Sequence, residues 1–217
     1  MGWREIEALC HKALAETSFL PEQPAPVDIE LFAETCFTND VGYEEMEHLG
    51  YTAFDANGRV LEIRVSTAID DGSTIGVRRT RATWAHECGH CLFHSAAFVR
   101  ETKSSVPAQP ILVNRKVSPI FTLSEHEERL REYQANQAIG SLLLPRSLVL
   151  TALNLRGLLI KSSASRFPTI RVEDSNDAMV LISETFDVSR TVAKHRLAKI
   201  FPIRKTSQLK FSFRFSR

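Results

Sequence analysis

The spacing of apolar residues predicts helices and a short sheet in the first part of the chain. Residues 3–17 carry apolar side chains on one helical face, and Asp28 stands where it can cap a second helix after a proline-containing turn. Apolar and polar residues then alternate over 51–54 and 60–65, on either side of the turn residues 55–58. This alternation predicts a β-hairpin, so we expect an α+β fold.

Helical spacing dominates after residue 80. Residues 81–97 contain no proline, and a second helical segment runs over 132–144 and ends at Pro145. Between these two helices, the segment from Ser104 to Pro119 holds three prolines, which predicts a loop that could form a lid over a site on the first helix.

The first of these helices contains an H-E-x-x-H motif, His86-Glu87-Cys88-Gly89-His90. Side chains four residues apart project from one face of a helix, so His86 and His90 can reach a single zinc ion. Glu87 follows His86 directly and can lie beside the metal without ligating it. A zinc hydrolase needs this combination of a Lewis acid, which lowers the pKa of water, and a carboxylate that accepts the proton.

A catalytic zinc site also needs a third protein ligand. His94 lies two turns beyond His86, about 12 Å along the helix axis, so we expect it to line or support the site without ligating the metal. Glu132 opens the next helix and can point back at the metal. Its competitors form the charged run just before it, which is typical of a solvated helix face: Glu125, His126, Glu127 and Glu128.

Two cysteines in the same helix suggest a different ligand set. Cys88 and Cys91 have C-x-x-C spacing. On a helix, however, they point roughly 100° or more away from the histidine stripe. We therefore expect both to be buried, reduced packing residues.

The chain resembles the ImmA/IrrE family of zinc metallopeptidases in two motifs that occur in the same order. Residues 83–94 read TWAHECGHCLFH, and residues 132–145 read EYQANQAIGSLLLP. Weaker similarity at 26–29 and 50–54 extends the resemblance over residues 26 to 150. Cys88 replaces a usual aliphatic residue, and the segment from 95 to 124 is longer than in compact members.

The resemblance implies a zincin-like metallopeptidase domain over residues 1–150, in which a small sheet packs on the active-site helix. It implies that His86, His90 and Glu132 bind Zn²⁺ and that Glu87 is the catalytic carboxylate. Candidate donors to the oxyanion are Tyr133, His94 and His126.

Composition agrees with an intracellular globular protein. The chain has 217 residues, of which 43% are hydrophobic and 24% charged, and its net charge of +1 gives no global attraction to nucleic acid or membranes. Its four cysteines lack the spacing of a disulfide framework, and the sequence does not start with a basic and apolar leader. No apolar run approaches the roughly 20 residues of a membrane span. We therefore expect a cytoplasmic protein without a membrane partner.

Residues 151–217 are predicted to form a small helical subdomain. Residues 178–197 resemble a helix-turn-helix in which Ser189 caps the second helix. That helix is expected to expose Arg190, Lys194, His195 and Arg196, a basic face of the kind that contacts DNA. The same pattern suits a helical unit packed on the peptidase, which the resembled family often carries, so nucleic-acid binding is not favoured. In the tail, residues 205–217 alternate phenylalanine with polar residues and suggest a terminal strand.

The sequence thus predicts an intracellular zinc endopeptidase that acts on a protein substrate. The family resemblance implies a regulatory protein as substrate, such as a helix-turn-helix repressor of a mobile element or of a stress response. Two alternatives stay open. One is a DNA-binding transcriptional regulator with a structural or vestigial zinc site, and the other is one half of a toxin–antitoxin module.

Overall fold

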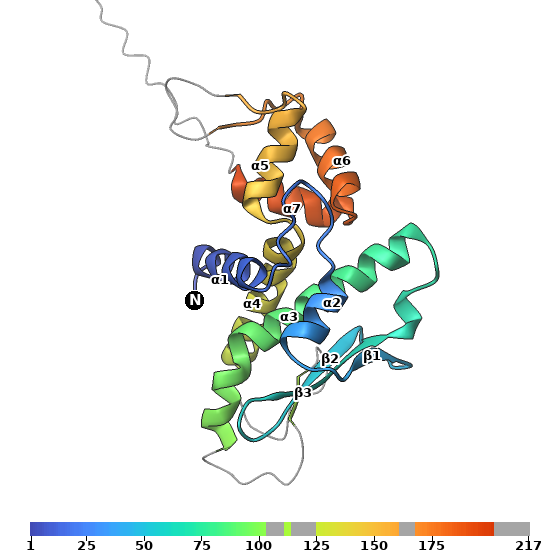
Figure 1. Ribbon diagram of the computed structural model, residues 1–217, viewed down its shortest axis with the longest axis vertical. Helices are drawn as coiled ribbons and strands as arrows, with labels where there is room; N and C mark the ends of the chain where they lie inside the picture. The colour runs from blue at the N-terminus through green and yellow to red at the C-terminus, as the bar shows by residue number, and fades with distance from the viewer. Residues whose placement is uncertain (103–110, 114–124, 161–167, 202–217) are drawn as a thin grey trace, which may run out of the picture.

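A long central helix separates a small sheet from a group of shorter helices. The structure is a computed structural model, and it describes residues 1–102, 111–113, 125–160 and 168–201. The central helix α3 (Thr74–Thr102) crosses the molecule, with the sheet at one end and α5, α6 and α7 gathered at the other (Figure 1). The described part of the chain is α+β, as predicted.

The sheet has the strand order β1-β3-β2-β4. The predicted hairpin is confirmed as β2 (Gly50–Phe54) and β3 (Val60–Ser66), which pair antiparallel with Thr52 opposite Ile63. Strand β1 (Val41–Glu44) pairs parallel with β3. It was not predicted, because its apolar and polar residues do not alternate clearly. Both inner strands contact α3. The sheet therefore presents β2 to the helix that carries the H-E-x-x-H motif.

The predicted loop from Ser104 to Pro119 is wrong in its middle. Residues Ile111–Val113 form strand β4, which pairs antiparallel with β2, with Leu112 opposite Ala53. A strand of three residues between prolines is too short to show a period of two, and its partner strand supplies the hydrogen bonds that define it. The remainder of that segment, and the predicted strand at 205–217, lie outside the described residues.

The helices of the first part follow the predictions. Helix α1 spans Trp3–Glu16, and α2 spans Ile29–Cys36 with the Asp28 carboxylate accepting from the Leu31 backbone amide at 3.2 Å. Helix α4 (Glu125–Leu143) includes the charged run at 125–128 that was predicted to be a solvated helix face, whereas α3 is longer than predicted because it begins with a largely polar stretch. Charged helix formers extend a helix without leaving a hydrophobic period in the sequence.

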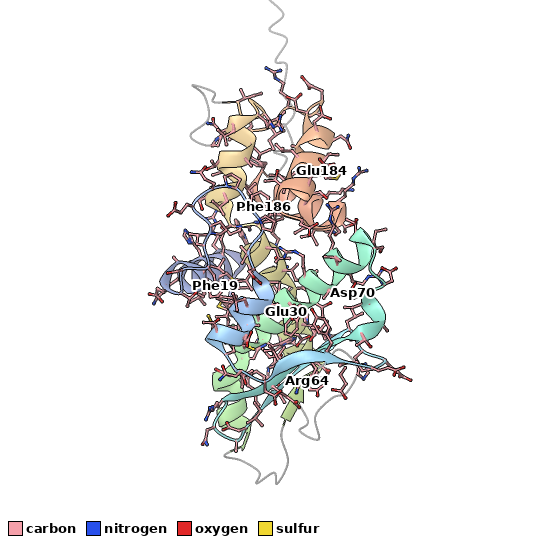
Figure 2. All side chains as sticks on the ribbon, turned by 45° about the vertical axis from the view of Figure 1, so that its right-hand side comes forward. Phe19, Glu30, Arg64, Asp70, Glu184 and Phe186 are labelled. Carbon is pink, nitrogen blue, oxygen red and sulfur yellow. The ribbon has the colours of Figure 1, made fainter. Side chains whose placement is uncertain are left out.

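The last three helices pack together at the end of the molecule away from the sheet. They are α5 (Arg146–Leu155), α6 (Ser175–Thr185) and α7 (Arg190–Ile200), and the Ser189 hydroxyl caps α7 by accepting from the Val192 amide at 3.2 Å, as predicted. Phe186, which is fully buried, lies in this end of the molecule, whereas Arg64 lies on the sheet at the opposite end (Figure 2).

The expected basic face of α7 is wrong at Arg196. That side chain is only 3% exposed; its Nε donates to the Leu144 carbonyl at 2.9 Å, and its Nη2 pairs with Glu7 of α1. Its Cδ lies 3.4 Å from where a Cβ on Gly140 would stand, so the glycine makes room for the arginine. Arg190, Lys194 and His195 remain exposed on α7.

The length and apolarity of the described helices can be compared with those of a membrane span. No single one of them is both long enough and apolar enough to cross a bilayer, and only α4 and α5 taken together, as a bent pair, reach that length and apolarity.

Candidate metal centre

The site lies where α3 and α4 cross at very short range. A Cβ on Gly89 would stand 2.7 Å from the Ala138 Cβ and 3.0 Å from the Ala135 Cα, so only glycine fits at this position. Ala135 and Ala138 of α4 are fully buried at this contact. The close approach brings the first turns of α4 next to the histidine face of α3.

This crossing brings His86, His90 and Glu132 together. Their nearest donor atoms are 3.0 Å apart between the two histidine Nε2 atoms, 3.3 Å between His90 Nε2 and Glu132 Oε1, and 3.5 Å between His86 Nε2 and Glu132 Oε2. Tetrahedral zinc with bonds of 2.0–2.2 Å separates its ligand atoms by about 3.3–3.5 Å. Both histidines are buried and Glu132 is partly exposed.

The three donors therefore fit a metal ion. Two imidazoles and one carboxylate form the set that hydrolytic zinc sites use, and three protein ligands leave one position for water or substrate. Other transition metals also bind such a set, so the geometry alone does not select zinc.

Glu87 stands beside this group without belonging to it. The side chain is 3% exposed, and its Oε2 accepts a hydrogen bond from the Thr52 hydroxyl of β2 at 2.9 Å. A Cβ on Gly50 would stand 2.9 Å from Thr83 Cγ2 and 3.1 Å from Glu87 Oε1, both on α3, so glycine lets β2 lie against α3 here. The sheet thus fixes the carboxylate from one side while α3 holds it beside the histidines.

His94 supports His90 from behind, as predicted. Its Nδ1 lies 2.9 Å from His90 Nδ1, and its Nε2 lies 3.1 Å from Gln134 Oε1. The amide oxygen can only accept, so His94 Nε2 carries its proton and His94 Nδ1 is left as an acceptor. His90 then donates from Nδ1 and presents the lone pair of Nε2 toward the metal group. Burial lowers the pKa of His94 to about 3, which keeps this ring neutral.

The cysteines take no part in the group. Cys88 and Cys91 are free and buried, as predicted, and burial raises the pKa of both thiols well above the usual range. Among the described ligand-type side chains, Glu132 is the partner of the two histidines, and its competitors His126, Glu127 and Glu128 lie outside the cluster. The side chain of Glu125 lies outside the described residues.

The structure gives little support to the three candidate oxyanion donors. Tyr133 is 45% exposed, and Lys199 of α7 lies over its ring with Nζ 5.8 Å from the ring centroid. His94 is engaged by Gln134, and His126 is exposed. None of the three is placed as a donor beside the metal group by its described contacts.

Sequence reasoning missed three residues that shape the site, namely Gly50, Thr52 and Gln134. Thr52 and Gln134 have no motif of their own, because their partners are 35 and 40 residues away in the chain. Gly50 did carry a signal, since a glycine at the start of a strand often marks a close approach of backbone to another element.

Comparison with known proteins adds no relative: no family model matches the chain, and no curated protein matches it either.

Proposed function

We propose that this protein is a zinc-dependent endopeptidase whose metal is held by His86, His90 and Glu132. The observation that carries the proposal is the convergence of these three donors beside a buried carboxylate that is not among them. Zinc, when bound, lowers the pKa of water and polarises the carbonyl of the scissile bond.

Glu87 is the proton carrier in this proposal. Its Oε2 is held by Thr52, so the carboxylate keeps one orientation beside the histidines. It accepts the proton of the attacking water and delivers it to the nitrogen of the leaving amine. His94 and Gln134 keep His90 in the tautomer and orientation that metal binding requires.

The resemblance of residues 83–94 and 132–145 to the ImmA/IrrE family supports peptide hydrolysis and a zincin-like fold as parts of this proposal. It also favours a regulatory protein as substrate and a cytoplasmic location. The alternative of a DNA-binding regulator loses support, because the buried Arg196 cannot contact DNA, and Lys199 of the same helix is half-buried, which leaves Arg190 and Lys194 as its exposed Lys and Arg side chains.

The substitution Glu87→Gln tests the proposal. Zinc-loaded wild type and Glu87→Gln are incubated with a peptide library made from a bacterial proteome digest, and new termini are identified by mass spectrometry. We expect wild-type cleavages that fall by about 10²–10⁴-fold in Glu87→Gln at unchanged zinc content, because only the base is lost. Glu184→Gln, an exposed change on α6, is the matched control.

The result against the proposal is equally specific. Equal cleavage by wild type and Glu87→Gln would remove Glu87 from the chemistry. An absence of cleavage by zinc-loaded wild type would speak against a peptidase of broad reach.

A further inference from the structure

A cavity of about 120 Å³ opens directly beside the proposed catalytic residues. His86 and Glu87 line it at one end, and its walls include the apolar side chains of Leu49, Ala82 and Ile139. A cavity of this size is roomy enough for a single side chain of moderate length. The cavity is bounded by α3, α4 and the residues at the start of β2.

Arg79 also lines this cavity. It precedes His86 by seven residues, which places both on the same face of α3 about 10.5 Å apart along the axis. The cavity therefore has a carboxylate and the metal ligands near one end and a cation toward the other, with apolar surface between them.

The guanidinium of Arg79 differs in its hydrogen bonding from those of Arg78 and Arg81 on the same helix. Arg78 pairs with the Asp187 carboxylate at 2.8 Å, and Arg81 donates to the carbonyls of Asp187 and Val27, both at 3.1 Å. The Arg79 guanidinium has no hydrogen bond or ion pair to any of the residues that the structure describes, although the Arg79 backbone carbonyl accepts a hydrogen bond from the Thr83 hydroxyl at 3.1 Å. The Asp71 carboxylate feels the charge of Arg79 only at longer range. Of these three arginines, the one at the cavity is the one available to a ligand.

We propose that the cavity binds the side chain of the residue next to the scissile bond and that Arg79 makes it selective for glutamate. The apolar walls suit the two methylene groups of glutamate, and the guanidinium can bind its carboxylate through two parallel hydrogen bonds. A glutamate side chain extending along α3 carries its charge away from Glu87. This inference rests on the proposed function and names the substrate class of the same site.

Three peptide hydroxamates test the selectivity without requiring turnover. The hydroxamate group binds the metal, and the compounds differ only in the neighbouring side chain, which is carboxyethyl, carboxamidoethyl or isobutyl. Binding to the zinc-loaded full-length protein is measured by calorimetry. We expect the carboxyethyl compound to bind about tenfold more tightly than its neutral isostere, with a ratio that falls as salt rises.

Variants assign the effect to one side chain. Arg79→Gln should bring the ratio of the two affinities to about one while leaving zinc content unchanged. Arg59→Gln removes the same charge from the turn between β2 and β3, outside the cavity, and should keep the wild-type ratio.

Several outcomes overturn the inference. Equal affinities for the two isosteres, a ratio that survives Arg79→Gln, or tightest binding by the isobutyl compound would each exclude glutamate selection by Arg79 and leave the metal site standing. If none of the three compounds binds zinc-loaded protein, the metal is not accessible, and the proposed function fails together with the cavity.

Discussion

Buried polar groups meet at two helix crossings in this protein, and the two networks differ in what they leave available. Where α3 crosses α4, two imidazoles and a carboxylate converge with their donor atoms 3.0–3.5 Å apart. Where α7 approaches α4 and α1, the buried Arg196 binds the Leu144 carbonyl and the Glu7 carboxylate. The side chains at the α3–α4 crossing can donate electron pairs to an added metal cation. The network around Arg196 already contains a cation, the guanidinium of Arg196 itself.

The α3–α4 crossing is thus suited to metal chemistry, and the network around Arg196 is suited to holding the fold together. A buried cation with carbonyl and carboxylate partners satisfies itself and ties elements together. A convergence of electron-pair donors acts together on an added metal ion. Mutations should therefore split the two regions: damage at the first should remove metal and spare the fold, and damage at the second should weaken the fold and spare metal binding.

The largest expected effect is the loss of metal in His90→Ala. Wild type should purify with about one zinc per chain and the variant with almost none, because two remaining ligands do not hold zinc against buffer. Elemental analysis measures this, with the exposed His195→Ala as control. Equal zinc in wild type and His90→Ala would reject the site.

Glu132→Ala tests the third ligand separately, and tight zinc binding in that variant would shift the assignment to the acidic residues before it.

Arg196→Ala tests the second region. We expect a loss of about 3 kcal/mol in the free energy of unfolding, because a buried ion pair is broken and Glu7 is left without its partner. Urea denaturation measures the loss. Lys194→Ala, on the exposed side of the same helix, should change stability by less than about 0.5 kcal/mol. If the two variants proved equally stable, the described burial of Arg196 would be wrong.

A smaller effect on zinc affinity is expected at His94, which links the metal ligand His90 to Gln134. His94→Leu keeps an apolar group in the space but removes the acceptor for His90 Nδ1. Zinc affinity should fall about 10–100-fold, measured by competition with a chromophoric chelator. Unchanged affinity would mean that His90 is oriented by packing alone.

The smallest expected effect concerns the thiols of α3. Replacing Cys88 and Cys91 together by alanine removes two buried sulfur atoms and should cost about 1–2 kcal/mol of stability. The zinc content should stay the same, because neither thiol belongs to the ligand group. A double variant that loses zinc would place sulfur at the metal.

The sequence predicted the first region better than the second for a physical reason. His86, Glu87 and His90 are fixed relative to one another by the geometry of one helix, so their spacing already implies their convergence. Arg196 is buried because of Glu7, which lies 189 residues away. The helical period places Arg196 about 160° around α7 from Lys194, on the opposite face, but it says nothing about such a distant partner. Strand β4 and the residues Thr52 and Gln134, which hold Glu87 and His94, were missed for the same reason, because their partners are distant in the sequence.

X-ray absorption at the zinc edge tests the central claim most directly. The zinc-loaded protein should show only nitrogen and oxygen neighbours at about 2.0–2.2 Å, with the outer-shell scattering of two imidazoles, and one imidazole fewer in residual zinc of His90→Ala. A sulfur shell at about 2.3 Å, or zinc with no imidazole scattering, would contradict a centre built from His86, His90 and Glu132.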